Sequence, residues 1–187
     1  MPNSEILDLI AQRYSCRAFS DKPVPDDVLD AILTAGLHAP SAVNAQPWRL
    51  IVVTDKALID EIDATGVALL EANDTASYDR TMGRGGHMLY NTPVIVLIAR
   101  PVEVSAYPDL DCGILASHLV LAAASLGVNS CIAGMPRVLF AGPDGDALTK
   151  RLGIPDGYRF ALSVMLGYAA GDAKPSHEID PSKIIRV

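Results

Sequence analysis

The sequence predicts a layered fold in which helices pack on a sheet, of the α/β or α+β class. Two observations predict it. Helix-length amphipathic segments come first along the chain, and four short apolar runs of strand length follow, separated by segments long enough for helices. The 187 residues fit one domain over residues 1–187, and 50% of them are apolar, which is enough to build a core. The pattern leaves open whether the strands pair in parallel or antiparallel.

Helices are predicted where apolar residues recur at helical spacing, in four segments: residues 4–14, 25–37, 57–72 and 109–126. The first helix carries an apolar face from Ile6 to Tyr14. Pro25 suits the first position of the second helix, and Pro40 ends it. Residues 114–124 are apolar nearly all round, so we expect the last helix to be central in the fold.

Strands are predicted in four apolar stretches: residues 48–54, 93–100, 129–135 and 159–168. The second of these is apolar throughout, which is typical of a strand buried on both faces. Residues 73–86 are polar and rich in glycine, so we expect a mobile surface segment there.

The charge and the cysteine count exclude several classes of protein. A net charge of −7 and a pI near 4.9 argue against a nucleic-acid partner, but they permit a small anionic ligand held by a local basic cluster. Three scattered cysteines without a C-x-x-C give no disulfide framework and no usual metal motif. The chain begins without a signal-peptide pattern and has no apolar run of membrane-spanning length, so no membrane partner and a cytoplasmic location are expected.

The common catalytic motifs are missing from the sequence. It contains no G-x-G-x-x-G, no G-x-x-x-x-G-K-[ST], no G-x-S-x-G and no H-E-x-x-H. The four histidines lack ligand spacing, and His118 is interpreted as a hydrogen-bonded histidine on a packed helix. A Rossmann dinucleotide site, a P-loop, a metal site and a hydrolase triad are therefore not supported.

The segment Arg13-Tyr14-Ser15-Cys16-Arg17 is the first that carries chemistry. Two arginines, four residues apart, flank a serine hydroxyl at the end of a predicted helix. Guanidinium groups match phosphate geometry, so the segment can form a phosphate site. The alternative is a pair of surface arginines that cap a helix C-terminus. Cys16 is either an oxidation-sensitive thiol in this site or a small buried filler.

The loop over residues 39–48, APSAVNAQPW, is the second such segment. Its asparagine and glutamine offer donors and acceptors that can bind the edge of a heterocycle, while its prolines and tryptophan supply apolar contact. The alternative is an ordinary helix-to-strand loop whose polar side chains cap backbone groups.

Taken together and in order, these segments resemble the flavin-dependent nitroreductase family. Five later stretches agree with that resemblance: Asn91-Thr92-Pro93-Val94-Ile95-Val96, Asp111-Cys112-Gly113, Ala124-Ser125-Leu126-Gly127-Val128-Asn129-Ser130-Cys131-Ile132-Ala133-Gly134, Leu152-Gly153-Ile154-Pro155 and Leu166-Gly167-Tyr168. The resemblance covers nearly the whole chain. It implies an α+β fold with a central, mainly antiparallel sheet of about four strands flanked by helices, and an intertwined homodimer with one FMN per subunit at the interface.

The resemblance also implies which residues bind FMN. Those implied at its phosphate and ribityl chain are Arg13, Tyr14, Ser15, Arg17 and Lys174. Those implied to reach the same flavin from the other subunit are Pro40, Ser41 and Asn44. The backbone N–H groups implied near flavin N5 and O4 are those of Ala133 and Gly134. No side chain is implied as a catalytic acid or base, because the flavin itself carries the hydride chemistry.

Some positions depart from the family pattern. Tyr14 stands where a basic residue is common, and the C-terminal stretch is less basic than usual, so His177 or Arg186 is an alternative phosphate partner. Arg84 and His87 lie where relatives often place a flavin contact. Arg84 is therefore interpreted either as a residue that contacts the flavin or as a solvated surface charge.

The function implied is an FMN-dependent oxidoreductase that takes hydride from NADH or NADPH. It would reduce nitroaromatics, quinones or similar small electron-poor acceptors by ping-pong turnover. One alternative keeps the fold with a different reaction, reductive dehalogenation or a flavin-consuming reaction. Another is a protein that binds flavin without useful turnover.

Overall fold

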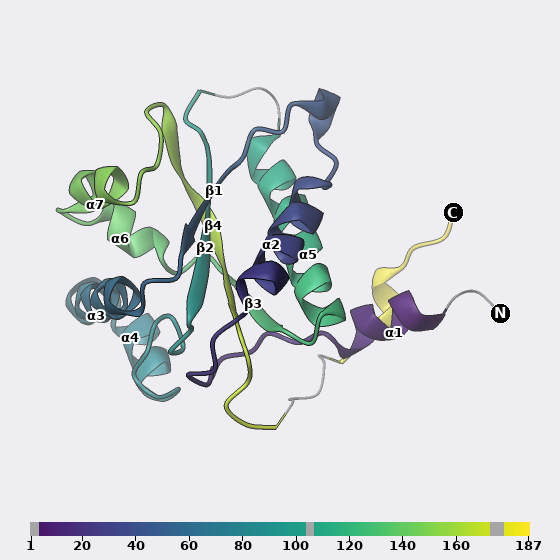
Figure 1. The fold of residues 1–187 in the computed structure, drawn as a ribbon, viewed down its shortest axis with the longest axis horizontal. Coiled ribbons are helices and arrows are strands. Elements are labelled where there is room, and N and C mark those ends of the chain that lie inside the picture. The colour runs from purple at the N-terminus through teal and green to yellow at the C-terminus, as the bar shows by residue number, and fades with distance from the viewer. Residues whose placement is uncertain (1–3, 104–106, 173–177) are drawn as a thin grey trace.

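The computed structural model describes residues 4–103, 107–172 and 178–187, and it has three layers. A sheet lies between two groups of helices (Figure 1). Helices α2 (Asp26–Leu37) and α5 (Pro108–Ser125) cover one face of the sheet. The helices on the other face are α3 (Lys56–Asn73), α4 (Thr75–Met82), α6 (Arg137–Ala141) and α7 (Gly145–Arg151). The α+β class expected from the sequence is confirmed.

The sheet contains four strands, and every pairing between them is antiparallel. The strands are β1 (Arg49–Val53), β2 (Val94–Pro101), β3 (Asn129–Ala133) and β4 (Tyr158–Gly167). Their spatial order is β1-β2-β4-β3, so the last strand is inserted between its two predecessors. The predicted strands agree with these bounds to within two residues. Pairing direction, which the pattern left open, is fixed as antiparallel.

The hydrophobic core consists of two clusters, one on each face of the sheet. Alternate residues of β2 enter different clusters: Val94, Val96 and Ile98 pack toward α2 and α5, whereas Ile95 and Leu97 pack toward α3 and α6. This alternation explains why the strand is apolar at every position.

Helix α5 is central, as its composition predicts, and it packs closely against α2. Gly36 of α2 faces Leu119 of α5, and a Cβ at Gly36 would lie 2.4 Å from the Leu119 Cδ2 atom. Only a glycine therefore permits this approach. The Nδ1 atom of His118 lies 3.0 Å from the carbonyl oxygen of Ile114, which agrees with the interpretation of His118 as a hydrogen-bonded helix residue.

The prediction of a mobile segment over residues 73–86 is wrong over Thr75–Met82, because these residues form helix α4. Asp74 caps this helix by accepting a hydrogen bond from the Ser77 N–H at 3.0 Å. Ser77 and Thr81 are both buried, and the Thr81 hydroxyl donates to the Ser77 carbonyl at 2.9 Å. The buried face of α4 is thus lined by hydroxyls, so it shows no apolar periodicity. The short helices α6 and α7 are also absent from the sequence-based expectation.

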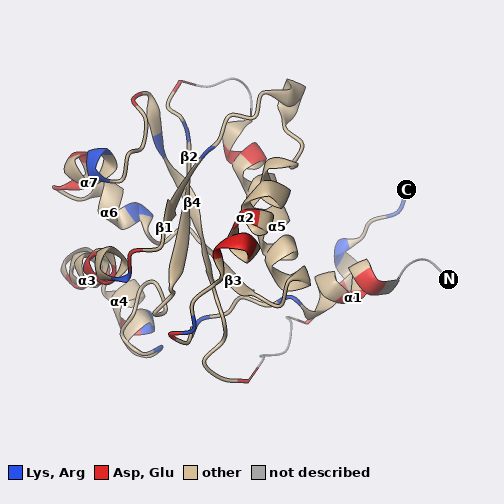
Figure 2. Ribbon diagram, in the orientation of Figure 1, with Lys and Arg blue, Asp and Glu red and all other residues tan. Residues whose placement is uncertain are grey.

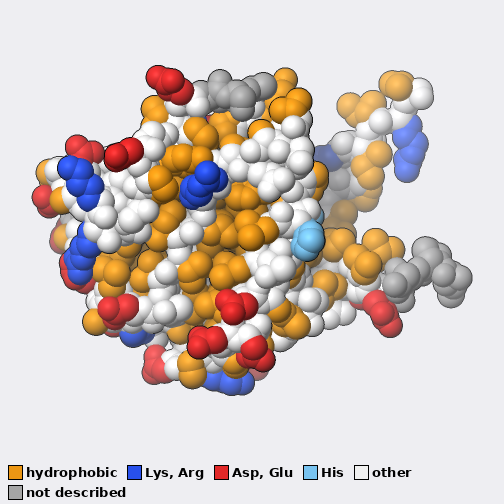
Figure 3. Space-filling view, turned by 45° about the horizontal axis from the view of Figure 1, so that its top comes forward, with side chains coloured by type: hydrophobic (Ala, Val, Ile, Leu, Met, Phe, Trp, Pro, Cys, Tyr) orange, Lys and Arg blue, Asp and Glu red, His pale blue; other side chains and the backbone are white. Residues whose placement is uncertain are grey.

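Helix α1 (Ser4–Gln12) projects from the body on the same side as the C-terminal end (Figure 1). It ends two residues before Tyr14, short of the predicted boundary. Its apolar face is not covered by the described chain, since Ile6, Leu7 and Ile10 are 62%, 58% and 49% exposed. Hydrophobic side chains also form a broad area on one face of the body (Figure 3).

Candidate functional site

The segment from Arg13 to Arg17 runs along the outer edge of strand β3. Ser15 forms a parallel bridge with Ser130, and the Cys16 N–H donates to the Ser130 carbonyl at 2.9 Å. Strand β3 is an edge strand of the sheet, so its free side is available for this pairing. The predicted phosphate segment is therefore held in place by backbone hydrogen bonds on the strand that ends at Ala133.

Asn129 anchors this segment to the centre of the sheet. Its Nδ2 donates to the Tyr14 hydroxyl at 3.3 Å, and its Oδ1 accepts from the Ala169 N–H at 3.0 Å, just beyond β4. Burial and, next, the charge of the Cys16 thiol raise the pKa of Tyr14. The sequence reasoning did not assign a role to Asn129, because its partners lie 115 and 40 residues away in the chain.

The thiol of Cys131 is buried on the strand beside this segment. Burial first, and also the charge of Cys16, raise the pKa of this thiol, whereas the charges of Arg17 and Arg13 and a hydrogen bond with Ser15 lower it. Basic residues, coloured blue on the ribbon, lie on the segment that leaves α1 (Figure 2). Beside them is a hollow of about 160 Å³, which Arg13 and Tyr14 share with Asn129 and Ser130. The arrangement places positive charge next to a small hollow in an otherwise acidic protein.

The other end of β3 exposes a glycine. Gly134 directly follows Ala133, the last residue of the strand, and is solvent-exposed. Apart from its chain neighbours, no atom of the described chain lies within 4 Å of the position that a Cβ would take at Gly134. Its backbone is not in the left-handed region either. Neither packing nor conformation within the described chain therefore requires a glycine here.

The loop at residues 40–47 is strained and stabilised by its own polar groups. Val43, Asn44 and Gln46 have φ angles of 48°, 56° and 44°, in the left-handed region that costs a residue other than glycine of order 1 kcal/mol or more. The Ser41 hydroxyl accepts from the Gln46 N–H at 2.9 Å, and the Gln46 side chain donates to Asn44 Oδ1 at 2.9 Å. Val43 is nevertheless 95% exposed.

This loop and the Arg13–Arg17 segment lie at opposite ends of helix α5. The Ala42 N–H donates to Asp111 in the first turn of α5, whereas Ala124, in its last turn, lines the hollow beside Arg13. Asp111 and Ala124 are thirteen residues apart, roughly 20 Å along a helix. One chain therefore does not bring Pro40, Ser41 and Asn44 to the predicted phosphate residues.

The contacts described above do not place two of the predicted residues, Arg84 and Lys174, at the site. Arg84 follows α4 in an exposed turn, where its backbone N–H donates to the Thr81 carbonyl at 3.0 Å. Lys174 lies outside the described residues, as does the alternative His177. Both Arg84 and Lys174 stay predictions.

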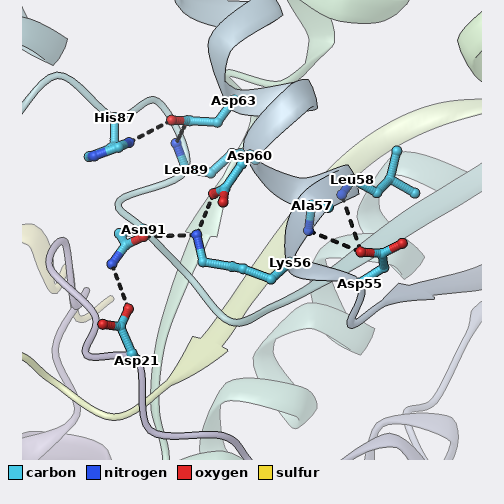
Figure 4. Close-up of polar contacts among 10 residues, drawn as sticks. All are labelled: Asp21, Asp55, Lys56, Ala57, Leu58, Asp60, Asp63, His87, Leu89 and Asn91. Carbon is cyan, nitrogen blue, oxygen red and sulfur yellow. Dashed lines mark hydrogen bonds and ion pairs between the residues drawn. The ribbon is translucent and has the colours of Figure 1, made fainter.

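A polar network that the sequence reasoning missed joins α3 to the chain before β2 (Figure 4). Asp63 is 5% exposed; its Oδ1 accepts from the Leu89 N–H at 2.6 Å, and its Oδ2 lies 2.7 Å from His87 Nδ1. This fixes the stretch in which the Tyr90 carbonyl accepts from the Phe19 N–H at 3.1 Å. An aspartate within the apolar stripe of a predicted helix is the signal that points to such a network.

A separate group of polar contacts joins α3 to the chain that follows the basic segment. The Lys56 ammonium binds Asp60 and donates to Asn91 Oδ1 at 2.9 Å, and Asn91 in turn donates to Asp21 at 3.3 Å (Figure 4). These contacts tie residues distant in the sequence into one framework.

None of the helices in the described ranges combines the length and apolar composition needed to cross a bilayer.

The chain is similar to known proteins over most of its length. A family model described as Nitroreductase family matches residues 10–168. A crystal structure of a nitroreductase with bound FMN from Desulfitobacterium hafniense is 42% identical, with a TM-score of 0.94 and coverage of 100% of both chains. A protein of Archaeoglobus fulgidus, provisionally named NADH dehydrogenase/NAD(P)H nitroreductase, is 32% identical over 94% of this chain and 91% of its own length. Iodotyrosine deiodinase 1 of Rattus norvegicus is 27% identical over 64% of this chain and 50% of its own length.

Proposed function

The chain belongs to the nitroreductase family, and we propose that it is an FMN-dependent oxidoreductase that takes hydride from NADH or NADPH. The observation that carries the proposal is the layout of strand β3. A basic segment is paired to the strand at Ser130, and an exposed glycine follows it at Gly134. The two positions are four residues apart, about 13 Å along a strand. This layout suits an elongated ligand with a phosphate at one end and a planar ring at the other.

The residues present suit the two ends of FMN. Arg13, Arg17 and the Ser15 hydroxyl offer the charge-assisted donors that a dianionic phosphate requires. The space beside Gly134, where a side chain would stand, suits the close approach of a flat ring to backbone N–H groups. When bound, FMN supplies the hydride chemistry, and the protein supplies binding, orientation and electrostatics.

We also propose that the functional unit is an intertwined homodimer. The loop carrying Pro40, Ser41 and Asn44 lies about 20 Å from the basic segment of its own chain, so a second copy would complete the site. Helix α1 and the C-terminal end both expose apolar side chains that a partner subunit would cover. These side chains are Ile6, Leu7, Ile10, Ile179, Ile184 and Ile185.

The proposed acceptors are small electron-poor compounds such as nitroaromatics and quinones, reduced by ping-pong turnover after the nicotinamide has left. The similarity to iodotyrosine deiodinase 1 favours reductive dehalogenation as the second candidate. Because NADH and NADPH are the proposed donors, we place the protein in the cytoplasm. Arg84 and Lys174 are kept as proposed FMN contacts.

Anaerobic titration of the purified protein tests these proposals. FMN-loaded protein should be yellow, should bleach on addition of NADH or NADPH, and should recover its oxidised spectrum on addition of a nitroaromatic or a quinone. Recovery with 3-iodotyrosine alone would favour the dehalogenase. Bleaching without recovery by any acceptor would indicate a protein that binds flavin without useful turnover. A protein that stays colourless after reconstitution with FMN would refute the proposal. Sedimentation analysis tests the dimer.

A further inference from the structure

Ser163 is a buried hydroxyl within an apolar stretch of β4, and its side chain reaches the end of β3. It is 0% exposed and is followed by the buried residues Val164, Met165 and Leu166. Ser163 lies opposite Ala133 in the antiparallel register. Its Oγ donates a hydrogen bond to the Ala133 carbonyl oxygen at 2.8 Å.

This hydrogen bond also determines where the Gly134 N–H points. The Ala133 carbonyl and the Gly134 N–H belong to the same peptide group, which is planar, with the two bonds directed to opposite sides. Holding the carbonyl toward Ser163 on β4 therefore directs the Gly134 N–H away from β4. In the described ranges, no hydrogen-bond acceptor is found for this N–H, and the space beside Gly134 is open.

We propose that Ser163 is a positioning residue for the flavin, acting through the Ala133–Gly134 peptide. This inference rests on the proposed function. The Ser163 hydroxyl fixes the peptide plane and, by polarising its carbonyl, strengthens the Gly134 N–H as a donor. A fixed donor aimed at the ring stabilises the electron-rich reduced ring more than the oxidised ring, since it needs no reorganisation as charge develops.

A buried hydroxyl forms a hydrogen bond whether or not it serves the flavin. The matched control is therefore a second buried hydroxyl whose hydrogen bonds do not involve the Ala133–Gly134 peptide. Thr92 is also 0% exposed, and its Oγ1 lies 2.8 Å from the Val94 carbonyl oxygen and 2.9 Å from that of Leu166. Val94 and Leu166 belong to β2 and β4, so neither of these bonds involves the Ala133–Gly134 peptide. Thr92→Val removes that hydroxyl and nearly preserves side-chain volume.

The test compares wild-type protein with Ser163→Ala, Ser163→Thr and Thr92→Val. For each protein, the dissociation constant of oxidised FMN and the two-electron midpoint potential of bound FMN are measured. Thermal unfolding of each variant separates a loss of stability from a change in the site.

We expect Ser163→Ala to weaken binding of reduced FMN about tenfold more than binding of oxidised FMN. This ratio corresponds to a midpoint potential about 30 mV lower. Ser163→Thr should restore the wild-type ratio of the two affinities and the wild-type midpoint potential. Thr92→Val should lower stability and leave the potential unchanged.

An unchanged potential in Ser163→Ala, or an equal shift in Thr92→Val, would overturn the positioning role while leaving the proposed function intact. Failure of the wild-type protein to bind FMN would instead refute the proposed function itself. The two failures are therefore distinguishable in one set of measurements.

Discussion

The buried carboxylate of Asp111 accepts a hydrogen bond from the backbone N–H of Ala42 at 3.0 Å. Asp111 is 4% exposed in the first turn of α5, where the helix dipole favours a negative charge. Ala42 begins the stretch in which Val43 and Asn44 adopt positive φ angles. One buried side chain thus connects a strained loop to the central helix of the fold.

Asp111→Ala should therefore loosen that loop and destabilise the protein. The Ala42 N–H would lose its acceptor, a change that costs about 1–3 kcal/mol. Asp111→Asn keeps an oxygen acceptor and should cost less. Denaturant unfolding measures the stability, and an FMN titration shows whether the loop contributes to binding. Equal stability of the alanine variant and the wild-type protein would contradict the structural role of this bond.

Replacing both Arg13 and Arg17 with alanine should weaken FMN binding far more than it affects folding. Each charge-assisted phosphate contact is worth ~1.5–3 kcal/mol, so the dissociation constant should rise at least about 100-fold. Isothermal titration with FMN measures the effect. The control is Lys150→Ala with Arg159→Ala, which removes the same charge from exposed residues of α7 and β4. Equal losses in the two double variants would indicate a general charge effect in place of a phosphate site.

Gly134→Ala should reduce FMN affinity without reducing stability. A Cβ at Gly134 meets no atom within 4 Å in the described chain apart from its neighbours, but it would stand where the ring is proposed to approach, at a cost of about 1–3 kcal/mol in binding. Gly145→Ala should show the reverse, since its Cβ would lie 2.3 Å from the Phe140 carbonyl oxygen. Melting temperatures and FMN titrations of both variants check the contrast. Unaltered FMN binding in Gly134→Ala would show that the flavin ring does not bind beside Gly134.

The ion pair between Glu61 and Arg151 should give an acid-sensitive contribution to stability. The Arg151 hydrogen bond holds the pKa of Glu61 below its ordinary value, and one Arg151 nitrogen lies 2.8 Å from Glu61 Oε2. A carboxyl with a lowered folded-state pKa stabilises the protein above its unfolded pKa, and this contribution is lost as the pH falls through the folded value. Glu61→Gln should thus be less stable than wild type at pH 7, with the difference vanishing in acid.

Denaturant unfolding across the pH range measures that difference. Because both side chains are exposed, high salt should reduce it at pH 7. The difference in the free energy of unfolding between the two proteins could also persist unchanged below the folded-state pKa of Glu61. That result would mean that the ion pair does not cause the difference.

Cys112 should be inert to thiol reagents in the native protein. Burial first, and the charge of Asp109 next, raise the pKa of Cys112 to about 11. The side chain is 0% exposed, so at pH 8 the thiol is both protonated and inaccessible. Alkylation followed by mass spectrometry should find Cys112 unlabelled in native protein and labelled after denaturation. Rapid labelling of native Cys112 would show that α5 opens readily.

The fold could be predicted where one physical signal dominates. Strand β2 is buried on both faces and α5 is apolar over most of its length, so composition alone located both. The structure buries only one face of α5, and Leu110, Gly113 and Ser117 are exposed. Helix α4 was missed because Ser77 and Thr81 occupy its buried face and satisfy their hydroxyls within the helix or beside it. Hydroxyl-lined faces give no apolar periodicity, so they look like loops in a sequence.

The candidate site was predictable in its residue types but not in its supporting contacts. The basic segment was predicted from its chemistry, and Gly134 from the resemblance to the nitroreductase family. Asn129, Asp111 and Ser163 were not, because each acts on a backbone group 30 or more residues away in the sequence. Such roles depend on strand register and helix placement, which local pattern does not specify.

The strand order β1-β2-β4-β3 also has a consequence for how the chain is made. Strand β4 spans residues 158–167 and pairs with both β2 and β3. The edges of β2 and β3 that face β4 therefore stay unpaired until β4 has been synthesised. Open apolar edges favour association between chains. Nascent or prematurely terminated chains that end before β4 should therefore be the aggregation-prone species, and the ones most dependent on chaperones during translation.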